Sequence, residues 1–131
     1  MAKASKMNDA IASQQKAVSI IPGFVDAWLN LGNALRESAS FNEAEAALKK
    51  ALDLMPDDPD TLFSQSLLDL QKGDFEEGWQ KYEARFQARK FAGDYPELPI
   101  PRWQGQPLSG KTLFVWAEQG LGDAIQFIRY L

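Results

Sequence analysis

The sequence predicts a mainly α-helical protein: an α-solenoid of antiparallel helix pairs, followed by a short, incomplete α/β segment of strand, loop and helix. The helix pairs are predicted because the chain aligns with itself at an offset of 34 residues, with KAVSIIPGFVDA (16–27) matching KALDLMPDDPDT (50–61). A period of this length indicates stacked supersecondary units. The α/β segment is predicted because proline and glycine become frequent after residue 92 and a β-branched, aromatic run follows at 111–117.

The composition of the 131 residues excludes several classes of function. The chain has no cysteine and no histidine, so it lacks the side chains for a disulfide, a Cys/His zinc site, a His-ligated haem or an imidazole-based catalytic triad. Its net charge of −4 gives no attraction for nucleic acid or for an anionic membrane. No apolar run approaches the ~20 residues of a membrane span and no signal peptide is visible. We therefore expect a cytoplasmic protein that holds no metal or cofactor and binds neither nucleic acid nor membrane.

Residues 1–24 supply only the second helix of a partial unit. This helix is predicted over 8–20, with Asp9 near its start and Pro22 after its end, because proline cannot continue a helix. The first helix of this unit is missing upstream.

Residues 25–58 form one complete unit, with helices predicted over 26–38 and 42–54. Gly32 and Ala44 are small enough for the two helices to approach where they cross, and Pro56 ends the second helix. Apolar side chains at helical spacing fill the contact: Trp28, Leu31, Leu35, Leu48 and Leu52. This order of Trp, Leu-Gly, Ala and Pro within 34 residues resembles a tetratricopeptide repeat (TPR).

Residues 59–92 are interpreted as a divergent, terminal TPR with helices over 60–71 and 75–88. Gln65 and Ser66 replace the Leu-Gly pair, and Arg85 and Lys90 replace the later alanine and proline. Without the small residue and the proline, a further unit cannot stack in register. The array is therefore expected to end here.

A Pro/Gly-rich connector over 93–110 leads to the predicted α/β segment, 111–131. A strand is predicted over 112–117, and a helix is predicted to start at Asp123, whose side chain can cap it. Both elements carry apolar side chains. We expect this segment to fold back on the last repeat, around Phe63, Leu67, Leu70 and Trp79, or to pair with a second copy; folding back is favoured because the connector is long enough to reverse direction.

The repeats, the GDFEEGWQKYEARF segment (73–86) and PRWQGQPLSGKTLFVWAEQGLGDAIQFIRYL (101–131) together resemble bacterial TPR proteins fused to a heptosyltransferase-like (GT-B) glycosyltransferase domain. The resemblance implies that Gly120, Gly122 and Asp123 form the first βα turn of a domain that binds a nucleotide sugar. The rest of that domain is not in this chain. We therefore expect no catalytic residues and no enzymatic activity in these 131 residues.

In a TPR array, the first helix of each unit lines a concave groove. The candidate peptide-binding residues are therefore Asp26, Leu29, Asn30, Asn33, Arg36 and Glu37 in the complete unit, and Phe63, Leu67 and Leu70 in the terminal one. A side-chain amide can donate to and accept from the backbone of an extended peptide, and Asn30 resembles the asparagine that contacts peptide main chain in the repeats of O-GlcNAc transferase. The alternative for the two asparagines is a solvated polar helix face.

The apolar face of the terminal unit either anchors a partner's side chain or is covered by the chain's own C-terminal segment.

These observations favour a protein-interaction module whose TPR groove binds a peptide or a partner protein. The alternative is the N-terminal fragment of a TPR-linked glycosyltransferase that uses a nucleotide sugar and is inactive in this short form.

Overall fold

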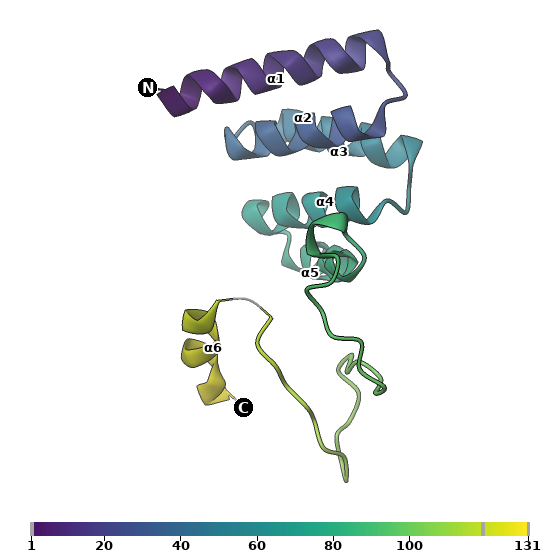
Figure 1. Cartoon of the computed structure of the whole chain (residues 1–131), viewed down its shortest axis with the longest axis vertical. Coiled ribbons are helices and arrows are strands. Elements are labelled where there is room, and N and C mark those ends of the chain that lie inside the picture. The colour runs from purple at the N-terminus through teal and green to yellow at the C-terminus, as the bar shows by residue number, and fades with distance from the viewer. Residues whose placement is uncertain (1, 119, 131) are drawn as a thin grey trace. The chain divides into compact units, whose positions relative to one another are not determined.

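A computed structural model of the chain describes residues 2–118 and 120–130 (Figure 1). The chain divides into two compact units between Ala92 and Gly93. The helices of the first unit are α1 (Ala2–Ile20), α2 (Val25–Glu37), α3 (Phe41–Leu54), α4 (Pro59–Lys72) and α5 (Phe75–Tyr82), followed by the 3₁₀ turns η1 (Glu83–Phe86) and η2 (Arg89–Phe91).

The first unit is a succession of antiparallel helices, in which each helix packs on the next (Figure 1). The first helices of the two pairs, α2 and α4, also contact each other. This arrangement agrees with TPR-like helix pairs. The observed bounds of α2, α3 and α4 lie within one residue of the predicted ones.

The core lies where α2 and α3 cross. A Cβ on Gly32 would fall 2.6 Å from Cγ of Leu48, and Ala44 is fully buried, which confirms that these small residues set the close approach of the two helices. The hydrophobic cluster around them consists of Val18, Ala27, Leu29, Leu31, Leu35, Ala44, Ala47, Leu48 and Leu68.

Local sequence signals explain where α4 begins and ends. The side chain of Asp58 accepts a hydrogen bond from the backbone N–H of Thr61 at 2.9 Å, and Pro59 occupies the first turn. At the other end, Gly73 adopts the left-handed conformation with φ +91°, which glycine tolerates without strain.

Two predicted helix bounds in the first unit were wrong. α1 begins at Ala2 instead of Asn8, because residues 2–7 contain good helix formers and no breaker; Asp9 therefore lies inside the helix. α5 ends at Tyr82, six residues before the predicted end at Ala88. Arg85 stands where the preceding pair has the buried Ala51, and its guanidinium lies 3.8 Å from the ring centroid of Phe86.

The prediction of a strand over 112–117, in the second unit, was wrong. In the described part of residues 111–118 the backbone forms no strand, because strand pairing requires a partner backbone for its hydrogen bonds. The helix α6 (Leu121–Phe127) begins two residues before Asp123 and is followed by the 3₁₀ turn η3 (Ile128–Tyr130). Its N-cap is Gly120, so Asp123 lies in the first turn and is not the cap.

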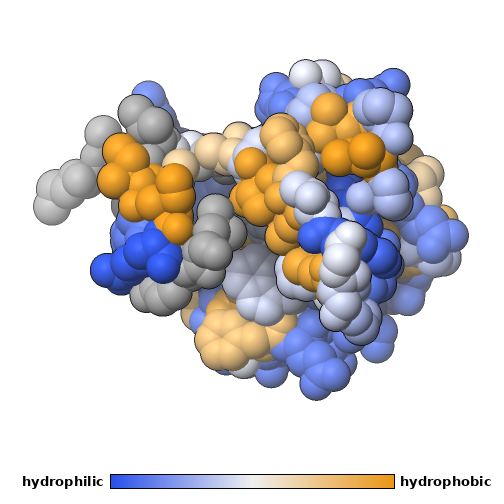
Figure 2. All heavy atoms as spheres, turned by 90° about the horizontal axis from the view of Figure 1, so that it is seen from below, coloured by the Kyte–Doolittle hydropathy of each residue, from blue (hydrophilic) through white to orange (hydrophobic). Residues whose placement is uncertain are grey.

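Several large hydrophobic side chains of the second unit are exposed, and Figure 2 shows hydrophobic atoms at the molecular surface among hydrophilic ones. In the described part of the chain, helices of a length and apolarity that could span a bilayer are absent.

Candidate binding surface of the first helices

The candidate site is the surface formed by equivalent positions of α2 and α4. We call it the first-helix surface and define it by four side chains of α2 and the four that follow 34 residues later: Asp26, Leu29, Asn30 and Asn33, with Asp60, Phe63, Ser64 and Leu67. At its far end, Nη1 of Arg36 on α2 donates to Oε1 of Gln71 on α4 at 3.1 Å, so the two first helices are joined there.

The polar, open part of this surface on α2 consists of Asn30 and Asn33. Asn30 is exposed and Asn33 is half-buried, three residues apart and therefore on one face of the helix. Glu37 is also exposed, one turn beyond Asn33. Leu29 departs from the prediction, because it is only 7% exposed and belongs to the core cluster. It packs inside the array and cannot line a groove.

The α4 half of the surface is covered by the chain itself. The ring of Phe63 contacts the rings of Tyr82 and Phe91, at centroid distances of 5.4 and 5.2 Å. Leu70, half-buried, lies against Gly78 of α5, and Leu67 is half-buried. Neither predicted role of this apolar face is observed for Phe63, because the residues that cover it, Tyr82 and Phe91, precede the connector and are not the C-terminal segment.

An ion-pair cluster joins this covering segment to both first helices. Arg89 donates from Nη2 to Oδ1 of Asp26 at 2.7 Å, from Nε to Oδ2 of Asp60, and from its backbone N–H to Oδ1 of Asp60 at 3.0 Å. The hydrogen bonds that Arg89 donates to Asp26 and Asp60 raise the pKa of its guanidinium above the ordinary value. The sequence analysis missed Asp60 and Arg89. The match of Asp26 to Asp60 in the repeat alignment was the available signal.

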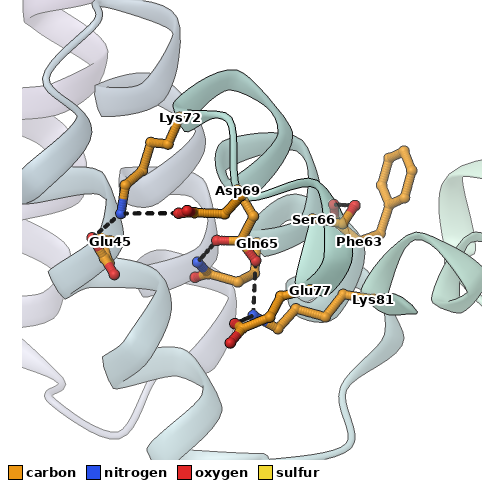
Figure 3. A network of polar contacts seen from close by, with 9 residues as sticks. Glu45, Phe63, Gln65, Ser66, Asp69, Lys72, Glu77 and Lys81 are labelled. Carbon is orange, nitrogen blue, oxygen red and sulfur yellow. Dashed lines mark hydrogen bonds and ion pairs between the residues drawn. The ribbon is translucent and has the colours of Figure 1, made fainter. Parts of the chain in front are cut away.

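A second polar cluster lies between α4 and α5 (Figure 3). Asp69, only 4% exposed, accepts hydrogen bonds from Nε2 of Gln65 and from Nζ of Lys81, each at 2.7 Å. Lys81 also reaches Glu77 at 3.2 Å. Burial lowers the pKa of Lys81, but the hydrogen bonds to Asp69 and Glu77 outweigh it and raise the pKa overall. These contacts replace part of the apolar seam of the preceding pair.

In α4, Ser66 replaces the glycine that α2 has at the equivalent position. It occupies the position equivalent to Gly32, is fully buried, and donates from Oγ to the backbone oxygen of Phe63 at 2.6 Å. A buried hydroxyl is tolerated when it is hydrogen-bonded. The departures at Gln65 and Ser66 therefore still give a packed pair, held by polar contacts.

The three residues singled out near the C-terminus lie at the start of α6. Gly120 has φ +64° at the N-cap, and Gly122 and Asp123 belong to the first turn. The strand expected before them is not formed in the described residues, so a βα turn that could face a nucleotide is not shown.

Comparisons with known proteins support helix-pair repeats. Residues 1–62 match the family described as Tetratricopeptide repeat. Protein FlbA of Caulobacter vibrioides is 33% identical to the chain over 126 residues, an alignment that covers 88% of this chain and 20% of FlbA. The first unit alone is too short to contain 88% of the chain, so the similarity extends into the second unit. The chain thus spans about a fifth of the length of this relative.

Proposed function

We propose that the chain is a protein-interaction module that binds an extended segment of a partner along α2. The match of residues 1–62 to tetratricopeptide repeats supports this, because such repeats generally mediate protein–protein interactions. The observation that carries the proposal is the pair Asn30 and Asn33, which lie on one helix face at the part of the first-helix surface that residues 82–91 leave open.

The chemistry of two side-chain amides suits a peptide backbone. Each amide has two N–H donors and one carbonyl acceptor, and can therefore pair with both the C=O and the N–H of an extended chain. Such contacts contribute affinity but do not depend on the partner's side chains. Specificity then comes from neighbouring groups: Arg36 and the exposed Glu37 supply a positive and a negative charge at the C-terminal end of α2.

The test is a double substitution, Asn30→Ala with Asn33→Ala. A peptide selected from an array for binding to the parent serves as probe, and its affinity is measured by calorimetry. Since each lost hydrogen bond removes about 0.5–1.5 kcal/mol, we expect binding to weaken roughly 5-fold to 150-fold for the pair, with unchanged helix content. The matched control is Asn42→Ala, at an exposed asparagine of the second helix α3. Equal affinity of the parent and the double variant would place the binding site elsewhere.

The alternative, the N-terminal part of a TPR-linked glycosyltransferase, rests on the sequence resemblance alone. Titration of the chain with a nucleotide sugar tests it. Under the binding-module proposal we expect no saturable binding and no sugar transfer by this chain, and saturable binding that depends on Gly120 and Gly122 would favour the alternative.

A further inference from the structure

Residues 82–91 occupy part of the first-helix surface in the manner of a bound peptide. Phe91 meets Phe63 edge-on, with an interplanar angle of 89°, and only 8% of Phe91 is exposed. Ala88 is 2% exposed. After α5 ends at Tyr82, the segment forms the 3₁₀ turns η1 and η2. Backbone hydrogen bonds close these turns locally, and the side chains of Phe91 and Arg89 attach the segment to the first helices.

Arg89 joins this segment to both first helices. Asp26 and Asp60 are equivalent residues of successive repeats, and one guanidinium binds both, through Nη2 and Nε. A lysine ammonium lacks this planar, forked set of donors. The side chains of Arg89 and Asp26 are 68% and 48% exposed, whereas that of Asp60 is 15% exposed, so the Asp26 side of the contact faces solvent.

We propose that the surface made by Asp26, Asp60 and Phe63 recognises a partner segment with an arginine followed two residues later by an aromatic ring. Residues 89–91 (Arg-Lys-Phe) are the internal occupant that such a segment replaces. This inference rests on the proposed function, since it names the chemistry of the partner that a binding module would accept.

The internal occupant has a large advantage over a free peptide. It is tethered to the surface through α5, and tethering gives an effective concentration in the millimolar range for short linkers, of order 1 mM. A free peptide of the same sequence should therefore bind the parent poorly. It should bind well once the internal residues are removed, and this difference defines the experiment.

The probe is a fluorescent peptide with the chain's own sequence EARFQARKFAGD (83–94). It is titrated, with anisotropy as readout, against the parent and against the opened variant Arg89→Ala/Phe91→Ala. We expect at least about tenfold tighter binding to the opened variant. A peptide with alanine at the position of Arg89 should bind the opened variant at least about tenfold more weakly. A peptide with alanine at the position of Lys90 is the matched control, because it loses the same charge one residue away.

Substitution on the surface shows where the peptide binds. In the opened variant, Asp26→Asn should weaken binding of the probe at least about fivefold. Asp53→Asn, which removes the same charge from an exposed position of α3, should leave it unchanged. Equal binding to the parent and to the opened variant, or equal binding with and without Asp26→Asn, overturns the proposal.

Loss of fold is controlled by circular dichroism. If the opened variant loses helix content, the single variant Arg89→Gln takes its place, and the probe must still bind it more tightly than the parent; equal binding again overturns the proposal. The Asn30→Ala/Asn33→Ala experiment uses other side chains and another peptide. Either experiment can therefore fail while the other succeeds.

Discussion

Gly78 of α5 lies against Leu70 of α4 so closely that a Cβ on the glycine would fall 2.8 Å from Cδ2 of the leucine and 3.2 Å from its backbone nitrogen. In the preceding pair the roles are exchanged, because Gly32 is on the first helix and faces Leu48 on the second, at 2.6 Å from Cγ. Each helix pair thus crosses at one glycine and one leucine, and the glycine can lie on either helix.

Gly78→Ala should therefore destabilise the first unit. Alanine is the better helix former by about 1 kcal/mol, but the new methyl group meets both the side chain and the backbone of Leu70. Overpacking of this kind costs about 1–3 kcal/mol, and we expect the net effect to lower the free energy of unfolding. Thermal unfolding measures it. Gly23→Ala is the control, since nothing lies within 4 Å of a Cβ there, and an equal Tm for Gly78→Ala and the parent would contradict the close contact.

Ala44→Leu should destabilise the crossing of α2 and α3. Ala44 is 0% exposed and its backbone oxygen lies 3.4 Å from the Cβ position of Gly32. Three added heavy atoms have no space, so we expect a loss of about 1–3 kcal/mol in denaturant unfolding. Ala46→Leu, at an exposed position of the same helix, should change the stability by less than about 0.5 kcal/mol. Similar effects at both positions would mean that Ala44 does not set the approach of the helices.

Lys81→Met should destabilise the contact of α4 and α5 by leaving the carboxylate of Asp69 buried without its cation. The side chains of Lys81 and Asp69 are 29% and 6% exposed, so we expect a cost of about 1–3 kcal/mol, below that for a fully buried pair. The double variant with Asp69→Asn should cost less than the sum of the two single variants, with a coupling energy of about 0.5–3 kcal/mol. Additive effects in this cycle would show that the ion pair contributes nothing.

The same lysine predicts a loss of stability at alkaline pH. Its pKa is raised above the ordinary value of 10.5, so the folded state holds the proton more tightly than the unfolded state. The resulting stabilisation is fully present below pH 10.5. It is lost as the pH rises through the folded-state pKa of Lys81. As the pH rises above 10.5, the free energy of unfolding should therefore fall more steeply for the parent than for Lys81→Met. Parallel curves for the two proteins would contradict the prediction.

Exposed apolar side chains of the second unit predict an effect of truncation. Phe114, Ile125 and Ile128 are 59%, 67% and 66% exposed, and such residues tend to find an apolar partner. We expect a chain that ends at Ala92 to unfold at a lower temperature than the full chain, as a docked segment requires. A smaller number of copies per particle than in the full chain, measured by sedimentation, would instead indicate association of copies through this segment. An equal unfolding temperature and an equal number of copies per particle would contradict both predictions.

The α2–α3 pair was almost fully determined by the sequence. Trp28, Gly32, Ala44 and Pro56 predicted both helices to within one residue of their observed bounds, because the signals that start, stop and space a helix act over one or two turns. The polar face with Asn30 and Asn33 was predicted by the same periodicity, since residues three apart on a helix share a face.

The tertiary structure decided which part of the first-helix surface stays open. Leu29 and Phe63 follow the same helical pattern as Asn30, yet both are buried, and Phe63 is covered by a residue 28 positions further along the chain. The contact of Arg89 with Asp26 spans 63 positions. The run at 112–117 has the composition of a strand, but a strand forms only with a partner backbone. Local patterns determine helices because their hydrogen bonds close within four residues, whereas covering a surface or pairing a strand depends on which distant segments the fold brings together.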